Sequence, residues 1–124
     1  FDEDLFLDMV DFDICWRVVE NGKLVVVDRD IKMPHEVGTN TIKIPFKILP
    51  ISSPIRNYYQ MRNVLCCALY KNKKSKFTVT YYMLRRFVNV LINLIFADKK
   101  LLRLQYNIKG IKDAINKNMG KIKI

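Results

Sequence analysis

The sequence predicts an α+β fold that is mainly α, in which a short helix and two extended segments precede about three amphipathic helices. Two observations carry this prediction. Apolar residues recur at helical spacings of three and four in several stretches, and one continuous β-branched run lies near the start. With 124 residues, of which half are hydrophobic, the chain can bury one modest core.

The first helix is expected over 12–20, with Asp11 as its N-cap and Gly22 just beyond its end. The run of valines in 23–28 predicts a buried strand. A polar turn then leads to a second extended segment over 31–35. Residues 36–54 contain Gly38, Pro45, Pro50 and Pro54, which exclude a long helix or a central strand there. We therefore place a boundary between 1–50 and 51–124.

Three helices are expected beyond this boundary. Ser53 and Pro54 are a good cap and first-turn residue for a helix that ends near Tyr70. A second helix is expected over 78–97 and a third over 101–118. The second carries an apolar stripe that suits either the core or a membrane interface. Its apolar run is too short and too often interrupted to cross a bilayer. The stripe consists of Leu84, Phe87, Val88, Leu91, Ile92 and Ile95.

Charge is unevenly distributed along the chain. Residues 1–30 hold nine acids and three bases, whereas residues 31–124 hold three acids and nineteen bases. This asymmetry indicates an anionic partner for the second part, which could be nucleic acid, a phosphate-bearing substrate or a membrane face. Three cysteines that form no C-x-x-C pair, with a single histidine, argue against a zinc site or a disulfide framework. Cys66 and Cys67 are expected to fill a helix face.

Two aspartates at the start of the first helix are candidates for chemistry. The free N–H groups of a helix N-terminus favour carboxylates in any protein, so Asp11 and Asp13 have a structural interpretation. The alternative is that Asp11 is a general base. His35 is the one histidine and could bind a divalent ion or a phosphate, although it cannot build a metal site alone.

A basic and aromatic cluster lies at the start of the helix that follows Pro54. Arg56, Tyr59 and Arg62 either belong to a solvated helix face or contact a phosphate or a membrane surface. Arginine offers bidentate geometry to phosphate, and tyrosine sits well at an interface.

Four ordered motifs resemble glycosyltransferase family 2, which has the GT-A fold, and within it the bacterial rhamnosyltransferase-type branch. The motifs are Phe1-Asp2-Glu3 with Val10-Asp11-Phe12-Asp13, Cys15, Arg17 and Gly22; Met33-Pro34-His35-Glu36-Val37-Gly38; Ser53-Pro54-Ile55-Arg56-Asn57-Tyr58-Tyr59 with Arg62-Asn63; and Gly110-Ile111-Lys112-Asp113. Many members carry Glu where this chain has Val10. The family's D-x-D motif and nucleotide-binding half do not precede Phe1, so we expect a piece of a longer protein.

The resemblance implies roles for particular residues. Asp11 corresponds to the catalytic base, Asp13 and Arg17 would support the helix or the acceptor, and His35 would bind metal or diphosphate. Residues 1–50 would end the catalytic domain on the acceptor side, and residues 51–124 would form a basic helical region. A divalent cation, Mg or Mn, is expected in the full-length enzyme, with none bound by this part alone.

The implied partners are a nucleotide-sugar donor held by the missing half, a glycan or lipid-linked acceptor, and an anionic membrane. The implied location is the cytoplasmic face of the bacterial plasma membrane, where the enzyme would be peripheral. No nucleic acid is expected. The alternatives are a non-catalytic basic module that binds nucleic acid, although no known motif for it is present, and a membrane-docking module.

Overall fold

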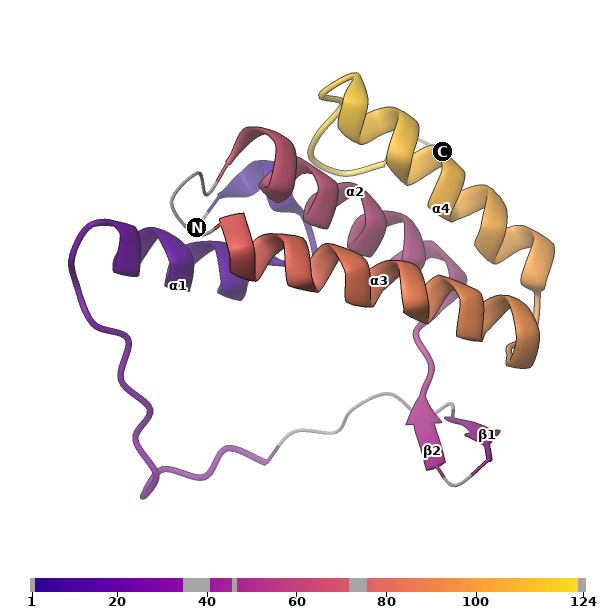
Figure 1. Cartoon of the computed structure of the whole chain (residues 1–124), viewed down its shortest axis with the longest axis horizontal. Coiled ribbons are helices and arrows are strands. Elements are labelled where there is room, and N and C mark those ends of the chain that lie inside the picture. Colours follow the sequence, from indigo (N-terminus) through magenta and orange to yellow (C-terminus); the bar gives the residue numbers. More distant parts are fainter. Residues whose placement is uncertain (1, 35–40, 46, 72–75, 123–124) are drawn as a thin grey trace.

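The computed structural model describes residues 2–34, 41–45, 47–71 and 76–122. Over these residues the chain is mainly helical, which confirms the predicted fold class. Figure 1 shows the helices lying against one another, with a small hairpin on one side of them. The elements are η1 (Glu3–Leu5), α1 (Val10–Glu20), β1 (Thr41–Ile44), β2 (Lys47–Pro50), α2 (Pro54–Tyr70), α3 (Lys76–Phe96) and α4 (Lys100–Ile115).

Helix α1 ends as the sequence predicts but begins differently. Gly22 has φ of +73°, and its N–H donates to the Val19 carbonyl while that of Lys23 donates to the Val18 carbonyl. This pair of bonds is the Schellman ending that glycine permits. At the other end Met9, in the left-handed conformation, is the N-cap, and it makes no side-chain capping bond. Asp11 therefore lies inside the first turn instead of capping it.

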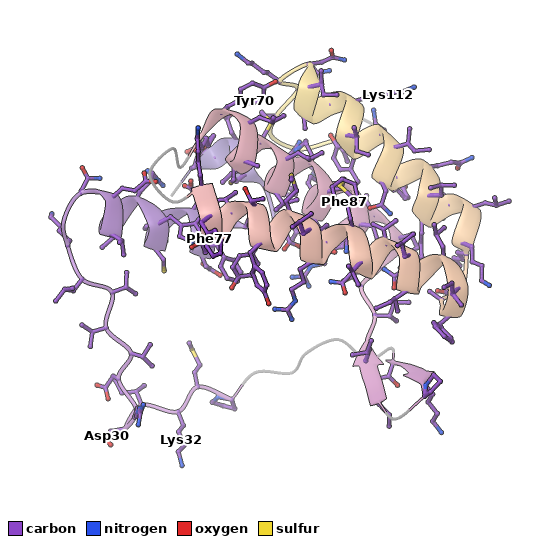
Figure 2. The ribbon with its side chains drawn as sticks, in the orientation of Figure 1. Asp30, Lys32, Tyr70, Phe77, Phe87 and Lys112 are labelled. Atoms are coloured by element: carbon purple, nitrogen blue, oxygen red, sulfur yellow. The ribbon has the colours of Figure 1, made fainter. Side chains whose placement is uncertain are left out.

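The predicted strand over 23–28 is wrong. Residues 23–34 have no regular secondary structure, and Leu24 and Val26 are 87% and 82% exposed. Figure 1 shows this segment running away from the helices, and the labelled Asp30 and Lys32 lie far from them in Figure 2. A buried strand needs neighbouring strands for its backbone, and no other described part of the chain pairs with it. The expected end of the second extended segment, at His35, lies outside the described residues.

The paired strands of the described chain lie instead within the Pro-containing stretch before α2. Strands β1 and β2 form an antiparallel pair in which Thr41 lies opposite Pro50 and Ile44 opposite Lys47. An edge strand tolerates proline because its outward N–H is not needed for pairing. The hairpin is joined to α2 by residues 51–53, and its strand β1 contacts α3.

Helices α2 and α4 pack closely because a glycine lies at their contact. A Cβ at Gly110 would be 2.7 Å from the Tyr58 carbonyl oxygen and 3.2 Å from the Arg62 nitrogen. Only hydrogen fits at this position without movement of the α2 backbone. The α2 boundaries, with Ser53 as N-cap and Pro54 in the first turn, are as predicted.

The apolar core joins both ends of the chain. Leu5, Trp16, Cys67 and Val79 form a buried cluster, with Met9, Tyr82 and Met119 packed against it. Residues before and after the proposed boundary therefore share one core. Cys66 and Cys67 are buried, as predicted for small side chains on a helix face, and burial raises the pKa of the Cys67 thiol to about 12.

Helix α3 turns its apolar stripe outward, so the core-facing alternative for this stripe is wrong. Leu84, Leu91 and Ile95 are 58%, 60% and 63% exposed. Val79 and Arg86, seven residues apart on the opposite face, are the buried residues of α3. The inward face can carry an arginine because α2 and α4 supply hydrogen-bond acceptors for it, the Asn57 carbonyl and Asn107 Oδ1. No helix in the described ranges combines the length and apolarity needed to cross a bilayer.

Candidate functional site

Helix α1 holds the predicted catalytic residue at the surface. Asp13 and Trp16 point into the protein and are 0% and 8% exposed. Asp11 precedes Asp13 by two residues, which is about 200° around a helix, so its side chain lies on the outer side. Asp11 is exposed. The helix is thus anchored on one face and presents a carboxylate on the other.

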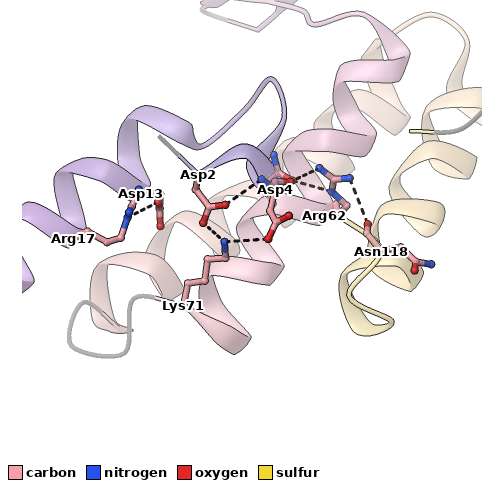
Figure 3. A network of polar contacts seen from close by, with 8 residues as sticks. Asp2, Asp4, Asp13, Arg17, Arg62, Lys71 and Asn118 are labelled. Carbon is pink, nitrogen blue, oxygen red and sulfur yellow. Dashed lines mark hydrogen bonds and ion pairs between the residues drawn. The ribbon is translucent and has the colours of Figure 1, made fainter. Parts of the chain in front are cut away.

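Asp13 is held inside the protein by a single ion pair. The Nε of Arg17 donates to its Oδ2 at 2.8 Å, one helical turn away (Figure 3). Its other oxygen, Oδ1, is buried and has no hydrogen-bond partner. The structure therefore brings together Asp13 and Arg17, two of the predicted site residues, and places the Asp13 carboxylate out of reach of solvent.

The predicted metal or diphosphate ligand, His35, lies outside the described residues. Among the residues that the structure describes, no three His, Cys, Asp or Glu side chains gather closely enough to hold a metal ion. We therefore assign no step to a metal ion held by these side chains.

Arg56 is at the surface, but it already has a partner. Its Nε donates to Asp8 Oδ2 at 2.8 Å, which connects the start of α2 to the segment before α1. The Arg56 side chain is half exposed, so the rest of its guanidinium remains open to an anion.

Tyr59 and Arg62 are buried, which corrects the prediction that they contact a phosphate or a membrane. They are 2% and 0% exposed. Arg62 donates from Nη1 to the Gly120 carbonyl at 2.6 Å and from Nη2 to the Asp4 carbonyl at 3.1 Å, and the Tyr59 hydroxyl accepts from the Ile122 N–H at 3.0 Å. These bonds join the two ends of the described chain to α2, as Figure 3 shows for Arg62.

A salt bridge reinforces the same region. The Lys71 ammonium is bonded to the Asp2 carboxylate (Figure 3). Desolvation opposes the charged form of Asp2, but the bond and charge of Lys71, the Asp4 N–H and the Arg17 charge together outweigh it and lower the pKa of this carboxyl. The acids before α1 thus hold the chain start against the end of α2.

Sequence reasoning missed a second buried polar network, between α2, α3 and α4. Arg86 Nη2 donates to Asn107 Oδ1 at 3.2 Å, and Arg103 Nη1 donates to Asn57 Oδ1 at 3.2 Å. Arg103 also pairs with Asp98 at 2.7 Å. The available signal was Arg86 itself, which is a charged residue seven positions after Val79 and hence on the same helix face.

Part of the chain is similar to a glycosyltransferase. That protein is the dTDP-rhamnosyl transferase RfbF of Shigella flexneri, which is 47% identical over 62 residues. The aligned region covers 50% of this chain and 21% of the relative, so the match spans about a fifth of the relative's length. No family model matches the chain, and no solved structure matches it.

Proposed function

We propose that this chain is the carboxy-terminal, acceptor-side part of an inverting glycosyltransferase that moves rhamnose from dTDP-rhamnose to a glycan or lipid-linked acceptor. The observation that carries the proposal is the 47% identity to a dTDP-rhamnosyl transferase over half of the chain. Residues 1–50 would complete the catalytic domain and residues 51–124 would form its helical extension. The donor and a divalent cation would be held largely by sequence upstream.

In this proposal Asp11 is the general base. Its carboxylate would take the proton from an acceptor hydroxyl as that oxygen attacks the anomeric carbon. The new bond forms on the face opposite the departing nucleoside diphosphate, so the configuration at the anomeric carbon inverts. The exposed position of Asp11 on a helix anchored by Trp16 supports this role, because an acceptor could approach a base that is held in place.

The donor assignment is tested by incubating the complete transferase with an acceptor glycan and either dTDP-rhamnose or dTDP-glucose. Products are followed by mass spectrometry. We expect transfer of rhamnose at least tenfold faster than transfer of glucose. Faster transfer of glucose would contradict the assignment of dTDP-rhamnose as the donor. Transfer of neither sugar to any acceptor tested would count against the assignment of the protein as a glycosyltransferase.

The outward face of α3 supports a second element of the proposal, which is contact with an anionic membrane surface. Phe77, Leu84 and Leu91 are exposed on it, and Lys99 and Lys100 follow its end; Figure 2 labels Phe77 and Phe87 along this helix. Apolar side chains flanked by cations suit the headgroup region of an anionic bilayer.

Liposome flotation of the chain tests the membrane contact. We expect flotation with anionic liposomes, and a reduction of at least fivefold in the double variant Leu84→Gln, Leu91→Gln. Thr80→Gln, which changes an exposed polar residue of the same helix, is the control. Equal flotation of the double variant and the wild type would remove α3 from the proposal.

A further inference from the structure

A cavity of about 380 Å³ lies between the start of α1, the segment before α2, and helices α2 and α3. Volumes of this size are in the range of small-ligand sites. Charged, amide and aromatic side chains line it, and they include Asp8, Phe12, Gln60, Tyr82, Arg86 and Asn89.

Arg86 is the unusual member of this lining. Its side chain is 9% exposed, and its Nε is buried without a hydrogen-bond partner. Within the described part of the chain, Nη2 bonds to neutral acceptors, Asn107 Oδ1 at 3.2 Å and the Asn57 carbonyl at 3.5 Å. Among the described residues no carboxylate forms an ion pair with Arg86. A buried guanidinium without a bonded counter-charge is costly. Desolvation lowers the pKa of Arg86 to about 10, and the nearby Asp8 charge offsets this only in part.

The surrounding charges leave the cavity positive. Asp8 is the acid of the lining, and its carboxylate is bonded to Arg56 at 2.8 Å. Arg85 adds a second guanidinium to the lining, from the exposed side of α3. Asp8 is ion-paired with Arg56 and only partly offsets the charge of Arg86, so an anion entering the cavity would meet two arginines against one carboxylate.

Two further features suit a sugar attached to that anion. Gln60 contributes a buried Oε1 with no partner, while its Nε2 lies 3.4 Å from Ser52 Oγ, so its carboxamide can bond a ligand hydroxyl. Phe12 and Tyr82, with ring centroids 4.9 Å apart, supply an aromatic wall. Amide groups beside an aromatic face match the alternating hydroxyls and C–H groups of a sugar ring.

We propose that this cavity binds the phosphate group of a sugar phosphate, with Arg86 as the anchoring cation. This proposal rests on the proposed function in identifying the ligand, which would be the phosphate-bearing end of the acceptor. Phe12, which lines the cavity, directly follows Asp11 on α1. A phosphate at Arg86 would hold the acceptor against the helix that carries the base.

The test is calorimetric titration of the chain with glucose 1-phosphate, glucose and inorganic phosphate at low salt. We expect glucose 1-phosphate to bind at least tenfold more tightly than glucose, and inorganic phosphate to bind more weakly than glucose 1-phosphate and to compete with it. Arg86→Gln should weaken the binding of glucose 1-phosphate at least tenfold. Arg29→Gln, which changes an exposed arginine outside the cavity, should leave binding unchanged.

A second variant guards against loss of folding, because Arg86→Gln also removes the bond to Asn107. Asn89→Asp adds a carboxylate at an exposed position of the lining and should weaken binding at least fivefold without moving the unfolding midpoint. Binding of glucose 1-phosphate no tighter than that of glucose would overturn the proposal, as would unchanged binding in both variants. If inorganic phosphate bound as tightly as glucose 1-phosphate, the cavity would be a phosphate site that does not recognise the sugar. Because none of these titrations measures sugar transfer, their failure is distinct from failure of the proposed function.

Discussion

At the scale of single residues, buried arginines join parts of the chain that are distant in sequence. Arg62 is fully buried and bonds to the Asp4 and Gly120 carbonyls. Its spacing of three to Tyr59 places both residues on one side of the helix, and a side rich in polar residues normally points to solvent. Its partners are backbone carbonyls far away in the sequence, so no local pattern could show that this face is buried.

Replacing Arg62 tests this role. In Arg62→Met the carbonyls of Asp4 and Gly120 lose their buried donor, so we expect a loss of about 3 kcal/mol in the free energy of unfolding. Urea denaturation followed by circular dichroism measures it. Arg29→Met, at an exposed arginine, is the control and should stay within about 0.5 kcal/mol of wild type. A loss below about 1 kcal/mol in Arg62→Met would show that these bonds are not important for stability.

At the scale of elements, the end of α1 and the start of α2 follow local chemistry and were predictable, whereas the start of α1 and the strand partners were not. Ser53, Pro54 and Gly22 mark helix ends through backbone geometry that depends on a few neighbouring residues. The valines of 23–28 favour extended backbone, but a strand also requires a neighbour that the described chain does not supply. The orientation of α3 likewise depended on its contacts with α2 and α4. The spacing of its apolar residues predicts a stripe on one side of the helix, but it does not show which side packs against the other helices.

The contact of α2 with α4 yields a prediction for Gly110. Alanine is the better helix former by about 1 kcal/mol, so propensity alone predicts that Gly110→Ala is stabilising. The new Cβ would lie 2.7 Å from the Tyr58 carbonyl oxygen, and separating the helices should instead cost about 1–3 kcal/mol. Thermal and urea unfolding measure the change, with the exposed Gln105→Ala on α4 as control. A stability equal to or above wild type would contradict the close packing.

At the scale of the whole molecule, the last helix is attached to α2 by an acid that responds to pH. The Asp113 carboxylate accepts from the Tyr58 hydroxyl at 2.9 Å and lies 3.3 Å from the Lys109 ammonium. Desolvation works against its charged form, but the bonds from Tyr58, Asn118 and Lys109 outweigh this and lower the pKa of Asp113 below its ordinary 3.8.

A carboxyl whose pKa is lower in the folded state than in the unfolded state stabilises the fold at pH values above its unfolded-state pKa. This stabilisation is lost as the pH falls through the folded-state pKa. We therefore expect Asp113→Asn to be less stable than wild type by about 1–2 kcal/mol near neutral pH. The difference should shrink as the pH falls below 3.8. Urea denaturation across this range measures it, with the exposed Asp30→Asn as control. A difference independent of pH would show that the Asp113 charge does not hold α4.

The candidate site was predictable only in part, again because of distant contacts. The aspartates of α1 could be recognised from their position at a helix start. That Asp11 is exposed and that Asp13 pairs with Arg17 became visible only in the structure. The cavity beside α1 could not be recognised, because its lining comes from α1, α2 and α3 and depends on an arginine that sequence patterns treat as an interruption of an apolar stripe.

We propose that α1 supplies the base of a sugar transfer, and one substitution tests this role most directly. In the complete transferase, Asp11→Asn removes the proton acceptor from an exposed position and should leave the fold intact. The measurement is the initial rate of rhamnose transfer from dTDP-rhamnose, with Asp30→Asn as the matched control. We predict a fall in rate of about 100-fold or more for Asp11→Asn, with a wild-type unfolding midpoint. A rate near that of the wild type would contradict the assignment of Asp11 as the base.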